Sequence, residues 1–305
     1  MGGSDECVNA LAVGILCSRF ETLHSFFPCR PFSGGVLSAT LIGVGFMDDS
    51  TAVSEEIRTL RKEQVQRFDK DFISDERFAG ICACIDRDFP SGVFRFLDVG
   101  GGIGAFADRL LERYPEANGH VLDNSEPLLS RNVQHPRKVV QLGSIEDAPH
   151  LVAARGFDIV FFNYSLHHFV VDSYRRTRKV QRRAISDAAS LLKSSGRLSI
   201  VENLCDGYIP PLSGLLIFTL TSSKMLAPLV KRLGAKTAGT GICYLDRRSW
   251  EREINQANFQ VTAFAADSKA PKWGFIRKLL LLIRDLRGGH YWAKSQSEVG
   301  LTKSE

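Results

Sequence analysis

Three glycines, Gly100, Gly102 and Gly104, follow an apolar stretch that ends on Asp98. Glycine lets the backbone pass close to a bound group, and a helix beginning at Ala105 would direct its N-terminal amides toward that group. This spacing predicts a site for a nucleotide-type cofactor. Because Gly100, Gly102 and Ala105 also fit the dinucleotide-binding fingerprint, the glycines alone leave two cofactor classes open.

Asp98 distinguishes these two classes. Dinucleotide-binding enzymes normally carry an apolar strand residue at this position, whereas here an acid precedes the loop. With Asp98, Gly100, Gly102 and Gly104 in this order, the chain resembles the class I S-adenosylmethionine-dependent methyltransferases over about residues 55–295. The resemblance implies S-adenosyl-L-methionine as the cofactor, bound along these residues.

The same resemblance extends to the ends of the next three expected strands. It implies that the Asp123 carboxylate accepts hydrogen bonds from ribose hydroxyls, with Asn124 beside it. Ser144 and Ile145 follow the third strand and are candidates for the adenine contact, although the family usually has an acid at the first position. Asn163 ends the fourth strand and is expected beside the methionine part of the cofactor.

Two adjacent histidines, His167 and His168, come shortly after the fourth strand. Imidazole titrates near neutral pH, so either residue is a candidate general base. The alternative is that one of them caps the next helix or packs in the core. Glu202 ends the fifth strand, where it would orient an acceptor or pair with a cation.

Strand and helix patterns alternate along most of the chain, which predicts an α/β fold. We expect a Rossmann-like, seven-stranded, mostly parallel sheet with helices on both faces, preceded by N-terminal helices and carrying an apolar helical lid insertion at 209–235. The expected strands lie near 93–98, 119–123, 138–142, 157–163, 196–202, 259–265 and 290–294. The expected helices lie near 104–114, 125–132, 174–193, 247–257 and 273–286.

The composition divides the chain into three parts. Residues 1–46 are almost free of lysine and read as an atypical, poorly ordered extension, so the functional protein is expected to start near Met47. Cap helices are expected at 47–92 and the methyltransferase domain at 93–305. The acidic start and the short apolar stretches do not fit a secretory signal or a membrane span, which favours a cytoplasmic protein. Seven cysteines without metal-ligand spacing indicate no metal site.

These features favour a methyltransferase that acts on a small, apolar metabolite, with O- or C-methylation preferred. An RNA or protein methyltransferase and an NAD(P)-dependent oxidoreductase are the alternatives. The net charge of +5 is mild, and the basic run at 175–183 reads as a solvated helix face, so nucleic acid is not favoured. The lid and the helix at 273–286 fit core or dimer packing, an apolar acceptor pocket or, less favoured, a membrane surface.

Overall fold

The computed structural model describes residues 57–58, 73–151, 156–268 and 275–296. All of them belong to one compact unit, Val53–Glu305. The extension expected at 1–46 and the start expected near Met47 lie outside the described residues. Of the cap expected at 47–92, the structure describes residues 57–58 and the stretch from residue 73, which includes helix α3 (Asp75–Asp88).

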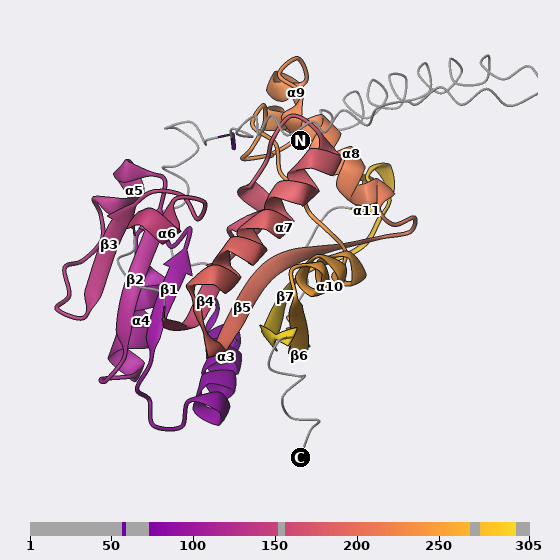
Figure 1. Ribbon diagram of the computed structural model, residues 1–305. Coiled ribbons are helices and arrows are strands. Elements are labelled where there is room, and N and C mark those ends of the chain that lie inside the picture. The colour runs from indigo at the N-terminus through magenta and orange to yellow at the C-terminus, as the bar shows by residue number, and fades with distance from the viewer. Residues whose placement is uncertain (1–56, 59–72, 152–155, 269–274, 297–305) are drawn as a thin grey trace, which may run out of the picture. The chain divides into compact units, whose positions relative to one another are not determined.

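Seven strands form one sheet in the order β3-β2-β1-β4-β5-β7-β6 (Figure 1). The strand β7 runs antiparallel to both of its neighbours, whereas the pairs among β1 to β5 are parallel. This confirms the expected mostly parallel, seven-stranded sheet. The strands are β1 (Arg95–Val99), β2 (Asn118–Asp123), β3 (Lys138–Leu142), β4 (Phe157–Asn163), β5 (Leu192–Gly207), β6 (Phe259–Ala266) and β7 (Ile283–Ser295).

Helices connect the strands, and polar side chains cap several of them. The hydroxyl of Ser173 accepts a hydrogen bond from the first turn of α7, and Asp246 does the same for α10. None of the described helices combines the length and apolarity needed to cross a bilayer. The helices after α3 are α4 (Ala105–Arg113), α5 (Glu126–Leu129), α6 (Ala148–Leu151), α7 (Tyr174–Leu191), α8 (Leu212–Ser222), α9 (Ala227–Arg232), α10 (Arg247–Gln256) and α11 (Phe275–Leu280).

The sheet is covered on both faces because side chains alternate along its buried strands. Phe96 and Phe161 pack with α3 and α4 in one apolar cluster. Their neighbours Leu97 and Phe162 belong to the cluster on the other face, which contains residues of α7 and α10. Helices on both faces were expected, and the structure confirms them.

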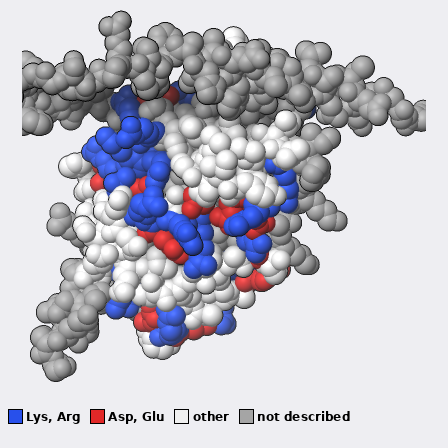
Figure 2. Space-filling model, turned by 90° about the vertical axis from the view of Figure 1, so that its right-hand side faces the viewer, with Lys and Arg blue, Asp and Glu red and all other residues white. Residues whose placement is uncertain are grey.

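The helices α7 and α10 are joined by ion pairs to one buried acid. Glu253 of α10 is fully buried and accepts hydrogen bonds from Arg178 and Arg182 of α7. In Figure 2, Lys and Arg atoms likewise have Asp and Glu atoms beside them. Part of the basic run at 175–183 is therefore neutralised by the fold.

The strands β5 and β7 continue beyond the neighbouring strand β4. The pairing of β4 with β5 ends at Asn163 and Val201, whereas β5 pairs with β7 as far as Gly207 and Ile283. A two-stranded ribbon therefore extends from the sheet (Figure 1). The lid helices α8 and α9 follow β5 at the end of this ribbon, and α11 precedes β7 there.

The helix expected over 273–286, with a strand only at 290–294, is wrong. The helix α11 ends at Leu280, and β7 begins at Ile283. Between them Leu282 has a positive φ of 53°, and its carbonyl accepts hydrogen bonds from the Tyr208 N–H and the Ser213 hydroxyl. The local sequence predicts a helix because apolar residues recur three positions apart. Pairing with β5 makes the segment a strand instead.

Asp88 joins three elements of the fold at the end of α3. Its carboxylate accepts hydrogen bonds from Arg87 Nε at 2.6 Å, Arg197 Nε at 2.7 Å and Trp292 Nε1 at 2.9 Å. Burial opposes ionisation, but these donors hold the pKa of Asp88 well below its usual range. The charged form thus ties α3 to β5 and β7.

We expect Asp88→Asn to lower the free energy of unfolding by about 2 kcal/mol at pH 7, because a partly buried, charge-assisted network loses its charge. Since the pKa is depressed in the folded state, this stabilisation is complete above about pH 5 and declines as the pH falls below about 4. Urea unfolding of both proteins at several pH values measures it. The exposed Glu112→Gln is the control, and a stability difference that does not change with pH would contradict the expectation.

Candidate active site

The glycine loop lies between β1 and α4 in a conformation that other residues rarely adopt. Gly100, Gly102 and Gly104 have positive φ angles of 72°, 55° and 76°. A Cβ atom on Gly104 would lie 1.9 Å from Oδ1 of Asn132, whose amide nitrogen donates to the Gly102 carbonyl at 2.8 Å. The loop is therefore held close to its neighbours, with the first turn of α4 beginning immediately after it.

Asp123 fixes the middle of this loop from the end of β2. One carboxylate oxygen accepts from the Gly102 N–H at 3.0 Å, and the other accepts from the Ser125 N–H at 2.8 Å. Burial raises the pKa of Asp123, while these two N–H groups act in the opposite direction. Each oxygen keeps a lone pair for a further donor, so the carboxylate can still receive hydroxyl groups. The adjacent Asn124 is exposed.

Asp98 lies beneath the loop and is almost completely buried. The amide nitrogen of Asn163 at the end of β4 donates to its Oδ1 at 3.1 Å. A Cβ atom on Gly101 would lie 2.6 Å from its other oxygen, so this glycine, which sequence reasoning did not single out, is also required. The structure thus brings together two residues that were predicted separately.

Three polar oxygens near the loop are buried and make no hydrogen bond among the described residues: Asn132 Oδ1, Asn163 Oδ1 and Ser165 Oγ. Ser165 packs against the loop, since a Cβ atom on Gly100 would lie 2.6 Å from the Ser165 Cβ. A buried polar atom without a partner is costly unless a ligand or water satisfies it. These oxygens therefore mark a polar binding surface beside the glycines.

His167 and Glu202 form a buried pair next to this surface. His167 Nδ1 lies 2.5 Å from Glu202 Oε2, and the His167 backbone N–H donates to Oε1 at 3.2 Å. Glu202 was expected to orient an acceptor or to pair with a cation. The structure shows it paired with His167. With Nδ1 engaged, Nε2 is the ring nitrogen that is left for proton transfer.

His168 has a different environment, although its ring centroid lies only 4.2 Å from that of His167. Burial and the neighbouring His167 lower the pKa of His168 well below the usual range, so it is neutral at physiological pH. His167 is therefore oriented by a carboxylate, whereas His168 is neutral.

Ser144 and Ile145 follow β3 as expected, but their side chains have local partners. The Ser144 hydroxyl donates to Asp147 Oδ2 at 2.9 Å. The Ile145 side chain is buried in the core cluster that contains α7. Their contact with a cofactor stays a prediction, and for Ile145 only the backbone is left to make it.

Tyr164, which follows β4, lies near an ion pair that sequence reasoning missed. It has a positive φ of 54°, an unusual conformation for a bulky residue, and its hydroxyl would lie 2.5 Å from a Cβ atom on Gly288. Nearby, Arg77 of α3 forms an ion pair with Asp267. Burial, with Asp267 adding to it, raises the pKa of Tyr164 to about 12, so its hydroxyl stays protonated. The consecutive glycines 288 and 289 within a strand were the available signal of this close approach.

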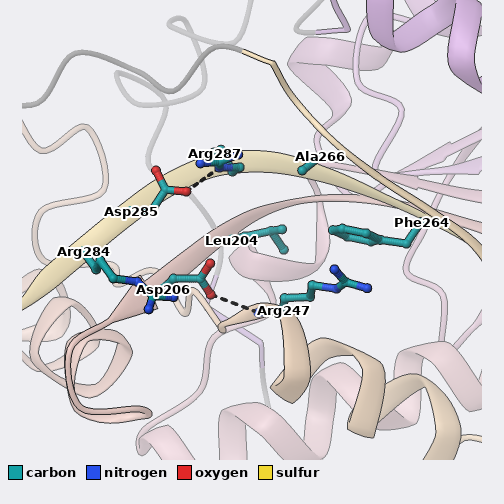
Figure 3. Close-up of a pocket in the computed structure, with 8 residues that line it drawn as sticks. All are labelled: Leu204, Asp206, Arg247, Phe264, Ala266, Arg284, Asp285 and Arg287. Carbon is teal, nitrogen blue, oxygen red and sulfur yellow. Dashed lines mark hydrogen bonds and ion pairs between the residues drawn. The ribbon is translucent and has the colours of Figure 1, made fainter.

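A pocket of about 520 Å³ lies on the ribbon and at the start of α10, and none of its lining residues belongs to the glycine loop (Figure 3). The Arg247 guanidinium lies 3.8 Å from the centroid of the Phe264 ring, and Arg287 forms an ion pair with Asp285. Charges of both signs therefore face this pocket. The lining residues are Leu204, Asp206, Arg247, Phe264, Ala266, Arg284, Asp285 and Arg287, of which Arg284 and Asp285 lie on β7 and not on the expected helix.

Comparison with known proteins finds one family model that matches part of the chain, and several solved structures that are similar to it. Residues 97–198 match the family model described as a methyltransferase domain. No curated protein matches the chain significantly. Among solved structures, the cyclase SpnF matches with a TM-score of 0.50 and 14% identity, over 74% of this chain and 85% of that one.

Two longer proteins are also similar. LepI in complex with SAM matches with a TM-score of 0.49 and 13% identity, over 77% of this chain and 51% of that one. The mitomycin 7-O-methyltransferase MmcR matches with a TM-score of 0.46 and 16% identity, over 67% of this chain and 50% of that one. This chain thus spans about half the length of these two proteins.

The matched residues 97–198 run from β1 into β5 and contain the glycine loop, Asp123 and His167. The match therefore covers the part of the chain from β1 to the start of β5, and the seven-stranded sheet continues beyond it with β7 reversed between β5 and β6.

Proposed function

We propose that this protein transfers a methyl group from S-adenosyl-L-methionine to a small, mainly apolar acceptor, at oxygen or carbon. The observation that carries the proposal is the glycine loop held between Asp98 and Asp123, at the carboxyl ends of the parallel strands of a sheet that contains the reversed strand β7. In the dinucleotide-binding Rossmann fold, six parallel strands follow the order 3-2-1-4-5-6. The reversed β7 therefore favours the methyltransferase over the NAD(P)-dependent oxidoreductase.

The residues around the loop suit this cofactor. When bound, S-adenosyl-L-methionine would supply a methyl group carried on a positively charged sulfur. The Asp123 carboxylate would accept the ribose hydroxyls, as its remaining lone pairs allow. Asn163 Oδ1 and Ser165 Oγ would face the ammonium and carboxylate of the amino-acid part, which supply the hydrogen-bonding partners that these buried atoms need.

His167 would act as the general base. Glu202 holds the imidazole through Nδ1, so Nε2 would receive the proton that the acceptor loses when its oxygen or carbon forms the new bond. The carboxylate also stabilises the imidazolium that results, as an acid partner does for histidine in other proton-transfer sites. His168 is held neutral and would contribute packing and shape.

The surroundings of His167 support an apolar acceptor. Its ring centroid lies 5.2 Å from that of Tyr244, which packs against a small apolar cluster beneath the lid. Burial raises the pKa of Tyr244, so the phenol is uncharged. Methyl transfer from a sulfonium mainly requires alignment and exclusion of water, which an apolar lid provides. The cluster consists of Cys205, Ile217, Ile242, Ile283 and Leu286.

Several further predictions from the sequence belong with this proposal. A cytoplasmic location and a homodimer stay predictions. An RNA or protein acceptor is less supported, because two arginines of the basic run on α7 are bound to Glu253. A small acceptor also fits the buried position of His167 better than a polymer does.

Cofactor binding tests the first part of the proposal. We expect S-adenosyl-L-methionine to raise the melting temperature and NAD⁺ or NADP⁺ to leave it unchanged. Asp123→Asn should weaken cofactor binding at least about tenfold, because an amide replaces one acceptor oxygen with a donor. Titration calorimetry measures this, with the exposed Asp172→Asn as the control. Stabilisation by a nicotinamide dinucleotide alone would show that the cofactor assignment is wrong.

Catalysis tests the role of His167. We expect His167→Gln to lower kcat by about 10² to 10⁴ with little change in cofactor affinity. His168→Gln should reduce kcat much less. Glu202→Gln should also lower kcat, since the variant loses the carboxylate that orients the imidazole through Nδ1. Equal losses in both histidine variants, or an unchanged kcat in Glu202→Gln, would contradict the assignment.

The acceptor itself is found by label transfer. Full-length protein is incubated with methyl-labelled S-adenosyl-L-methionine and fractionated small-molecule extracts, and the labelled product is identified by mass spectrometry. We expect an apolar product labelled on oxygen or carbon. Cofactor binding without label transfer to any fraction would count against the proposal, since the methyltransferase fold also occurs in the cyclase SpnF.

A further inference from the structure

The lid carries large apolar side chains that face solvent. The Met225 side chain between α8 and α9 is 78% exposed, and Leu229 of α9 is 43% exposed. The helix α8 is apolar on all sides, so it cannot bury every face against the protein. We define the lid face as the exposed apolar residues Ile209, Leu215, Met225, Leu229, Leu233 and Leu279.

The stretch of chain that carries most of the lid face has charged side chains of one sign only. No Asp or Glu occurs anywhere from Gly207 to Leu245, whereas Lys224, Lys231 and Arg232 are exposed there. This differs from α7, where Arg176 pairs with Asp172, and Arg178 and Arg182 with Glu253. This stretch of 39 residues contains no acid, in a chain with 34 acids, so its own charged side chains are all positive.

The elements that carry the lid face are fixed to one another. The Ser213 hydroxyl of α8 donates to the carbonyl of Leu282, the residue that joins α11 to β7. Ile217 of α8 packs in the same apolar cluster as Ile283 of β7. The lid and the end of α11, where Leu279 is 57% exposed, therefore form one surface at the end of the ribbon (Figure 1).

We propose that the lid face docks the protein onto an anionic lipid surface. Exposed apolar side chains interleaved with lysine and arginine are what an interfacial membrane contact requires, because the apolar groups enter the headgroup region while the cations meet anionic lipids. The absence of acids across the lid removes the repulsion that such a surface would otherwise meet. The inference goes beyond methyl transfer and does not rest on it.

Vesicle sedimentation tests this proposal with the full chain. We expect the protein to pellet with vesicles of equal parts phosphatidylcholine and phosphatidylserine but not with phosphatidylcholine alone, and to be released by high salt. The triple variant Lys224→Gln, Lys231→Gln, Arg232→Gln should bind at least about tenfold more weakly. The double variant Met225→Ser, Leu229→Ser should also bind more weakly, although its charge is unchanged.

The matched control removes three exposed cations from α7: Arg175→Gln, Lys179→Gln and Arg183→Gln. Its net charge equals that of the lid triple variant, so it should bind vesicles like the wild type. Thermal melts of all variants verify folding. No binding to anionic vesicles, or an equal loss in the α7 control, would overturn the proposal. So would a dimer, found by light scattering, that the Met225→Ser, Leu229→Ser variant dissociates, because a second copy would then cover the lid face.

Discussion

A carboxylate can lie in the middle of a parallel sheet only where other groups replace the water that it loses. Asp98 meets this constraint at the end of β1, beneath the glycine backbone and within hydrogen-bonding distance of the Asn163 amide. A side chain on Gly101 would displace the carboxylate, and a different residue at Asn163 would remove its donor. The buried carboxylate of Asp98 therefore limits which residues can occupy the loop and the end of β4.

The register of the sheet converts this local constraint into a site. In the pairing of β4 with β5, Asn163 lies opposite Val201, so the next residue, Glu202, comes level with the turn that carries His167. The carboxylate then binds both the ring and the backbone of His167. The glycine loop and the proposed base are therefore both positioned through β4, which pairs with β1 on one side and with β5 on the other and cannot shift by one residue without exposing core side chains.

Sequence reasoning succeeded where the signal is local. Strands followed by Asp98, Asp123 or Asn163, and the glycines between them, are recognisable because each lies within a few residues of the element that positions it. The pair of His167 and Glu202 depends on strand register, and that of Arg77 and Asp267 joins residues 190 positions apart, so neither can be read from spacing. The expected helix at 273–286 was wrong for the same reason, because a distant partner strand decides the conformation.

The ribbon of β5 and β7 separates the glycine loop from the lid helices α8 and α9. Side chains of a strand alternate between its faces, so two residues added to each strand would carry the lid about 7 Å outward while every remaining side chain kept its orientation. A single added residue would turn the ribbon over. The distance of the lid from the sheet can thus change in steps of two residues per strand. Evolution can therefore change the size of the space beneath the lid without altering the glycine loop.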